Sequence, residues 1–101
     1  MNTTDVIMAR VYMTEGEHRL AEFLQLLHDE LKVKGVTVFR GITGFGKSGK
    51  MHSSNLLDVS MDLPLAVEFF DVPERMTEVL DRIKQDFEPG HIVNWSARVN
   101  V

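Results

Sequence analysis

The chain has 101 residues, of which 44% are hydrophobic and 26% are charged, and this size and composition predict one globular domain over residues 1–101. Its formal net charge of −4 argues against a general nucleic-acid binder, and its lack of cysteine excludes disulfides and thiolate chemistry. Because no apolar run reaches the roughly 18 residues that span a bilayer, and the first residues do not form a secretion signal, we expect a cytoplasmic protein without membrane insertion.

The first part of the chain predicts a strand, a helix and a second strand. Residues 6–12 are apolar and partly β-branched, which is typical of a strand. Apolar residues then recur at helical spacing over residues 19–33, and we expect this helix to stop at Gly35. Residues 36–39 begin the second strand.

The second part predicts two further strands around a second helix. Residues 47–62 are polar and weakly patterned, which indicates a loop, and residues 63–70 read as the third strand. Residues 71–74 mark a helix start with proline in the first turn, and residues 88–90 end that helix. Residues 93–101 alternate apolar and polar side chains, as a half-exposed strand does.

The order βαββαβ predicts an α+β, ferredoxin-like fold: a four-stranded antiparallel sheet with two helices on one face. The uncovered face of this sheet is predicted to be neither polar nor fully apolar. On the third strand, for example, Ala66 and Phe70 share that face with Glu68. Such a mixed face suggests a subunit interface, so we expect an oligomer built through the sheets.

The segment from Arg40 to Lys50 follows the second strand and is rich in glycine and positive charge. It holds four of the seven glycines of the chain and three cations. Glycines let the backbone approach a ligand closely, and free backbone N–H groups beside cations form a concavity suited to phosphate or another anion. The candidate ligand-binding residues of this region are Arg40, Gly41, Gly44, Phe45, Gly46, Lys47, Ser48, Lys50 and His52.

Several of these side chains have a structural interpretation beside the functional one. Arg40 can offer a bidentate fork to phosphate, or it can pair with Glu68 on a neighbouring strand. Phe45 can stack on a base, or it can anchor the loop to the core. His52 can change its charge near neutral pH or touch a ligand, or it can simply be exposed.

Residues 41–48 also match the phosphate-loop signature G-x-x-x-x-G-K-S. That motif needs a helix directly after it, so that the helix N-terminus faces the phosphates. Here Gly49 follows at once, and residues 50–55 lack apolar periodicity. We therefore do not interpret the segment as the site of a phosphate-loop hydrolase.

Metal binding and catalysis are not indicated by the sequence. The four histidines are scattered, without a pair at ligand spacing on one element. No nucleophile has an obvious partnered base. We expect no metal site and no catalytic residue.

The order of elements and the glycine-rich segment together resemble the PII-like signal-transducer superfamily. Residues 44–48, Gly-Phe-Gly-Lys-Ser, are similar to the Gly-Phe-Gly and polar pair that end the second strand of nitrogen-regulatory PII proteins. The chain is most similar to a small, mostly uncharacterised PII-like domain family, and the likeness is carried by residues 35–46, 52–54 and 62–68.

This resemblance implies a homotrimer with clefts between subunits that take an adenine nucleotide (ATP, ADP or AMP). It also implies a mobile loop, here residues 47–62, that contacts a protein partner such as a transporter or an enzyme. Arg98 could match a late-strand arginine that the facing subunit supplies. The chain departs from PII proteins because only residues 88–91 stand where they have a second glycine-rich loop, and because Ser48 replaces a glutamine.

The expected function is therefore that of a non-catalytic sensor without a cofactor, which binds an adenine nucleotide or similar anion. One alternative is a small phosphate-ester or acyl-phosphate hydrolase on the same fold. Its phosphate cradle would follow the first strand, where residues 13–18 hold only Gly16. The other alternative is a trimer that only binds protein.

Overall fold

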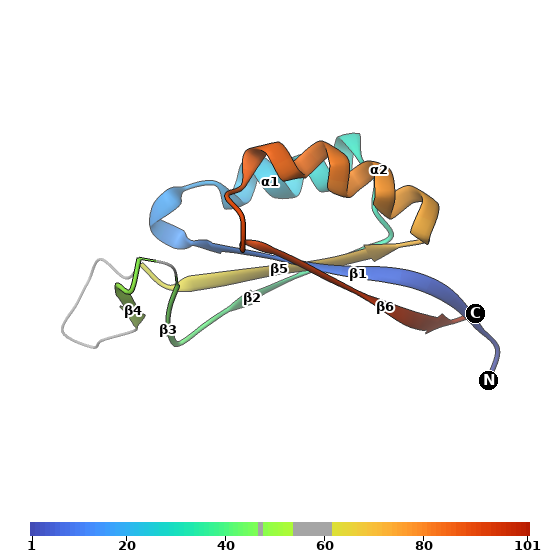
Figure 1. The fold of residues 1–101 in the computed structure, drawn as a ribbon, viewed down its shortest axis with the longest axis horizontal. Coiled ribbons are helices and arrows are strands. Elements are labelled where there is room, and N and C mark those ends of the chain that lie inside the picture. Colours follow the sequence, from blue (N-terminus) through green and yellow to red (C-terminus); the bar gives the residue numbers. More distant parts are fainter. Residues whose placement is uncertain (47, 54–61) are drawn as a thin grey trace.

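The computed structural model describes residues 1–46, 48–53 and 62–101. Within them, one antiparallel sheet has the strand order β2-β5-β1-β6, and helices cover one of its faces (Figure 1). The four strands are β1 (Thr3–Thr14), β2 (Gly35–Arg40), β5 (Pro64–Asp71) and β6 (Ile92–Asn100). This architecture confirms the predicted α+β, ferredoxin-like fold.

A small hairpin extends from one end of the sheet, opposite the end that carries both termini (Figure 1). It consists of β3 (Thr43–Phe45) and β4 (Met51–Ser53), with Gly44 opposite His52. The expected loop over residues 47–62 thus contains a strand in its described part, while residues 47 and 54–61 lie outside the described residues.

The helical layer is made of short pieces. These are η1 (Glu15–Glu17), α1 (Leu20–Gln25) with the π-helical turn η2 (Leu26–Glu30), and α2 (Pro73–Ile83) with the 3₁₀ turn η3 (Lys84–Asp86). None of the helices in the described part of the chain is both long and apolar enough to cross a membrane.

The core lies between the sheet and the helices, and it follows the periodicity of the sequence. Alternate residues of β5 are buried, and α2 buries one stripe. Phe23 on α1 makes edge-to-face ring contacts with Phe69 at 6.2 Å and with Phe87 at 5.2 Å between ring centroids. The buried cluster contains Ala9, Val11, Met13, Phe23, Leu27, Leu65, Val67, Phe69, Met76, Val79 and Ile83.

The first helix does not stop at Gly35, contrary to the prediction. Lys32 adopts the left-handed conformation with φ of 51°, and the amide of Val33 donates to the carbonyl of Leu27 at 3.2 Å. This is the geometry that closes a helix, and a lysine supplies the residue that is usually glycine. Gly35 instead begins β2, where a Cβ would lie 2.6 Å from the ring of Phe70.

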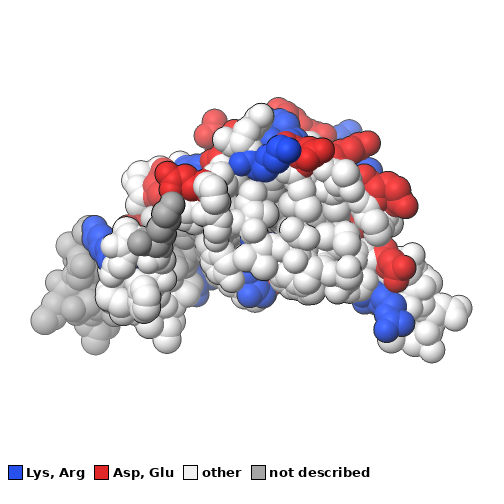
Figure 2. Space-filling view, viewed as in Figure 1, with Lys and Arg blue, Asp and Glu red and all other residues white. Residues whose placement is uncertain are grey.

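The uncovered face of the sheet is largely apolar and carries one ion pair. Phe39 on β2 is 51% exposed and Trp95 on β6 is 38% exposed. Between these edge strands, Arg10 pairs with Glu68 at 2.6 Å and lies over the ring of Trp95, 5.4 Å from its centroid. Charged side chains gather over the helical layer instead, whereas the side below it is mostly uncharged (Figure 2).

Candidate ligand cleft

An open cleft of about 1170 Å³ lies at the end of the sheet beside the hairpin. Its walls come from the end of β1, the end of β2 with the hairpin, the start of β5, and the segment 87–91 before β6. Six of the ten predicted site residues line it, namely Arg40, Gly41, Gly44, Phe45, Gly46 and Ser48.

Of the other predicted site residues, Lys50 and Arg98 are not among the described residues that line this cleft. Lys50 and His52 belong to the hairpin, where His52 lies opposite Gly44. Arg98 pairs with Asp5 in the β1–β6 ladder, toward the end of the sheet that carries the termini (Figure 1). Lys47 lies outside the described residues.

The structure gives Arg40 a different partner from the one considered in the sequence. Its Nε forms an ion pair with Glu15, which follows β1. Glu68 is instead bonded by Arg10, through Nη2 at 2.6 Å and Nε at 3.1 Å. The register explains this, because Arg40 lies opposite Leu65 and is therefore three residues away from Glu68 along β5. The Arg40–Glu68 interpretation is wrong.

Some glycines of the segment allow close packing against Pro64, and Gly49 allows a turn of the chain. The amide of Gly41 donates to the carbonyl of Pro64 at 2.7 Å, and a Cβ on Gly41 would lie 2.8 Å from Cγ of that proline. A Cβ on Gly44 would lie 3.3 Å from the same atom. Gly49 has φ of 76°, and its amide donates to the carbonyl of Gly46 at 2.9 Å. The expectation of free amides throughout the segment is therefore wrong at Gly41 and Gly49.

Phe45 is not an anchor in the core of its own chain. It lies in β3 opposite Met51, and 70% of its surface is exposed. Its ring is therefore available at the rim of the cleft.

The segment 87–91 forms a wall of the cleft that residue patterns alone did not place there. The amide of Tyr12 donates to the carbonyl of His91 at 2.9 Å, which fastens the segment to β1. Gly90 turns the chain with φ of 93°. The comparison with the second loop of PII proteins had singled out residues 88–91, whereas nothing in the sequence pointed to Tyr12.

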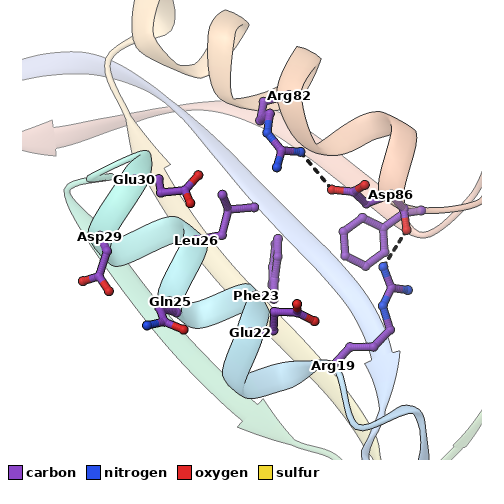
Figure 3. A pocket seen from close by; sticks show the side chains of 10 residues that line it. Arg19, Glu22, Phe23, Gln25, Leu26, Asp29, Glu30, Arg82 and Asp86 are labelled. Carbon is purple, nitrogen blue, oxygen red and sulfur yellow. Dashed lines mark hydrogen bonds and ion pairs between the residues drawn. The ribbon is translucent and has the colours of Figure 1, made fainter.

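Arg19 joins the cleft to a second hollow of about 660 Å³ in the helical layer (Figure 3). Its guanidinium lies 4.2 Å from the ring centroid of Phe87, and Nη2 donates to the carbonyl of Asp86 at 2.5 Å. Arg82 pairs with the carboxylate of Asp86 at 3.1 Å. Both arginines of this hollow therefore have partners within the chain, and none of the described predicted site residues lines it.

The residues after the phosphate-loop match do not form a helix. Residues 48–53 make a turn followed by β4. Among the described residues, no three His, Asp or Glu side chains gather to hold a metal ion.

The fold is that of solved PII-like structures. A structure titled CPII bound to ADP and bicarbonate, from Thiomonas intermedia K12, has a TM-score of 0.67 and 23% identity, covering 99% of this chain and 91% of that chain. A second CPII structure, described as a nitrogen regulatory PII-like protein bound to ADP, AMP and bicarbonate, has a TM-score of 0.69 and 19% identity, covering 99% and 100%.

The chain belongs to the DUF190 family, described as uncharacterized ACR, whose model matches residues 6–99. A relative named UPF0166 protein, from Aquifex aeolicus (strain VF5), is 31% identical over 81 residues, which is 76% of this chain and 77% of the relative. The likeness to PII-like proteins, predicted from the order of elements and the glycine-rich segment together, is confirmed for the fold.

Proposed function

We propose that this chain is a non-catalytic PII-like sensor that binds an adenine nucleotide, or a similar anion, in clefts between the subunits of a homotrimer. The observation that carries the proposal is the cleft beside the hairpin, because six predicted site residues of the glycine-rich segment line one side of it and the segment 87–91 lines another. An open cleft between separate segments is where ligands bind most often.

The chemistry of the cleft supports an anionic ligand with an aromatic part. The guanidinium of Arg40 suits phosphate or carboxylate oxygens, and the exposed ring of Phe45 offers a face to a base. The CPII structures of the same fold carry ADP, AMP and bicarbonate, so this fold can hold both a nucleotide and a small oxyanion.

The uncovered sheet face supports the homotrimer. Phe39 and Trp95 leave apolar surface at both edges, around the Arg10–Glu68 pair. Exposed apolar area of this kind marks interaction surfaces. Arg98 lies away from the cleft of its own chain, so its proposed contact with the ligand requires a neighbouring subunit.

The proposed sensor regulates a protein partner, such as a transporter or an enzyme, which binds to the hairpin and the loop 47–62. The hairpin projects beyond the sheet, and its strand β3 lines the cleft. A bound ligand would therefore touch the same segment that the partner meets.

Calorimetry with ATP, ADP and AMP tests the proposal, with bicarbonate titrated alone and together with each nucleotide. We expect at least one nucleotide to bind, and we expect Arg40→Gln to weaken that binding. If no nucleotide binds at millimolar concentration, the nucleotide version is wrong, and bicarbonate binding alone would leave the small-anion version. Protein binding without any ligand effect would point to a trimer that serves only as a protein-binding module.

Hydrolysis of an acyl phosphate is the outcome that would replace the sensor with an enzyme. The segment after β1 does not favour it. Glu15 and Glu17 make that turn acidic, and the amide of Gly16 donates to Asp62 at 2.5 Å.

A further inference from the structure

We propose that Glu15 is an internal competitor for the anion at Arg40, so that a ligand must displace this carboxylate and Glu15 sets the affinity of the cleft. The inference rests on the proposed function, because it concerns the regulation of the same site. It assigns a role to a residue that sequence reasoning did not place in the site.

The contact between the two side chains supplies the first evidence. Oε1 of Glu15 meets Nε of Arg40, and the side chain of Glu15 is 23% exposed against 65% for Arg40. A carboxylate accepts hydrogen bonds from a guanidinium with the geometry that phosphate and bicarbonate oxygens also use. Glu15 therefore holds the position on Arg40 that an incoming anion needs.

The backbone of Glu15 is fixed independently of Arg40. Its amide donates to the carbonyl of Leu63 at 2.9 Å, and the next amide, that of Gly16, donates to Asp62 at 2.5 Å. On the other side, Glu17 accepts from the amide of Thr14 at 2.7 Å. The turn that positions the carboxylate of Glu15 beside Arg40 is thus held by bonds that do not involve Arg40.

The size of the effect follows from how often the pair is formed. The apparent association constant equals the intrinsic association constant multiplied by the fraction of molecules in which Arg40 is not paired with Glu15. An ion pair at this exposure is formed in most, but not all, molecules, which corresponds to about a fivefold weakening of an anion that needs Arg40. Adenosine has no anionic group, so its binding does not depend on the displacement of Glu15.

The test compares ADP binding by calorimetry to the wild type and to Glu15→Gln, with Glu74→Gln as the control. Glu74 is exposed in the first turn of α2 and does not line the cleft, so its substitution removes the same charge without removing the partner of Arg40. We expect Glu15→Gln to bind ADP about fivefold more tightly, and Glu74→Gln to change the affinity less than about twofold. We expect both variants to bind adenosine as the wild type does.

A double-variant cycle shows whether the gain passes through Arg40. In an Arg40→Gln background, Glu15→Gln is expected to give no further gain. An equal gain with and without Arg40, or an equal gain in Glu15→Gln and Glu74→Gln, would overturn the inference while leaving the sensor proposal in place. If ADP does not bind to either protein, the same comparison is made with ATP, AMP or bicarbonate, and both proposals are wrong only if none of these anions binds to the wild type or to Glu15→Gln.

A spectroscopic measurement on the unmodified protein keeps the inference testable if Glu15→Gln does not fold. The Nε–Hε resonance of Arg40 reports its partner directly. Saturation with ADP is expected to shift this resonance, together with the side-chain carboxyl resonance of Glu15. Binding of ADP that leaves both resonances unchanged would overturn the inference.

Discussion

Gly41 and Gly44 are required for close packing against Pro64. Both pack against its ring, and the carbonyl of Pro64 accepts the amide of Gly41. The sequence correctly marked this segment as special, because glycines cluster where backbones approach closely. It could not show that the close neighbour is a proline from β5, since that contact joins residues more than twenty positions apart.

Gly41→Ala is expected to lower the free energy of unfolding by about 1–3 kcal/mol, because its Cβ would lie 2.8 Å from Cγ of Pro64, a ring atom that cannot rotate away. Urea denaturation at one fixed protein concentration measures this change. Gly46→Ala is the control, since no atom of the described residues lies within 4 Å of a Cβ at this position. We expect its stability to stay within about 0.5 kcal/mol of the wild type. Equal losses in the two variants would contradict the packing role of Gly41.

A pH effect is expected at Asp29. The hydrogen bond from His28, at 2.7 Å, lowers the pKa of the Asp29 carboxyl below its ordinary value of 3.8. Because the pKa of Asp29 is lower in the folded state, its carboxylate stabilises the fold at pH values above its ordinary pKa of 3.8. This contribution is lost as the pH falls through the pKa of the folded state. His28→Gln should therefore raise the pKa of Asp29, which carboxyl NMR titration measures. An unchanged pKa would contradict the assigned cause.

At the scale of elements, the strand β5 and the helix α2 were predictable, whereas the end of the first helix was not. Alternate burial along β5 and proline at the start of α2 are local signals. The left-handed Lys32 depends on Arg75 from α2, whose guanidinium donates to the carbonyls of Leu31 and Lys32. A contact between two helices leaves no local pattern in the sequence.

Arg75→Met is expected to lower the free energy of unfolding by about 2 kcal/mol. Arg75 holds the end of η2, and it also lies 3.6 Å from the buried carboxylate of Asp71, which would lose its cation. Arg82→Met on the same helix is the control, because the Arg82–Asp86 pair is exposed and is worth about 0.5 kcal/mol. Urea denaturation compares the two variants, and an equal loss in both would contradict the anchoring role of Arg75.

At the scale of the whole molecule, the uncovered sheet face is the surface that the proposed trimer would bury. The hydrogen bond from Arg10 to Glu68 raises the pKa of Arg10 above its already high value. Arg10 therefore keeps its charge up to strong alkali, so we expect no change of assembly near neutral pH from the titration of Arg10. The mixed character of the face was predictable from residues 66–70, but its partner is a second chain, which one sequence does not describe.

Trp95→Glu is expected to convert the proposed trimer into monomers, because it would place an unpaired charge inside the interface. Native mass spectrometry and light scattering measure the assembly. Asn94→Glu adds the same charge at the neighbouring position, whose side chain lies on the other face of β6. We expect that variant to remain trimeric. A trimeric Trp95→Glu variant would contradict assembly through this face.

Only one side of the candidate cleft could be predicted, because sequence motifs mark residues that are neighbours along the chain. Residues that are adjacent in sequence, such as Gly44 and Phe45, were found together because a motif marks them. Tyr12 and the segment 87–91 reach the cleft only through the pairing of strands. Glu15 reaches Arg40 only through the turn after β1. Sequence patterns identify residues that are close along the chain, so the residues of the opposite wall of a cleft can be assigned only from the structure.

The bond from the amide of Gly41 to the carbonyl of Pro64 means that the chain leaves the sheet and returns to it at neighbouring positions. Between those two positions, the described residues include the hairpin β3–β4, which pairs outside the four-stranded sheet. Loop length costs little free energy once the base is closed. We therefore expect that replacing this hairpin with the corresponding segment of another family member leaves the four-stranded sheet intact, while it changes the wall of the cleft that β3 supplies.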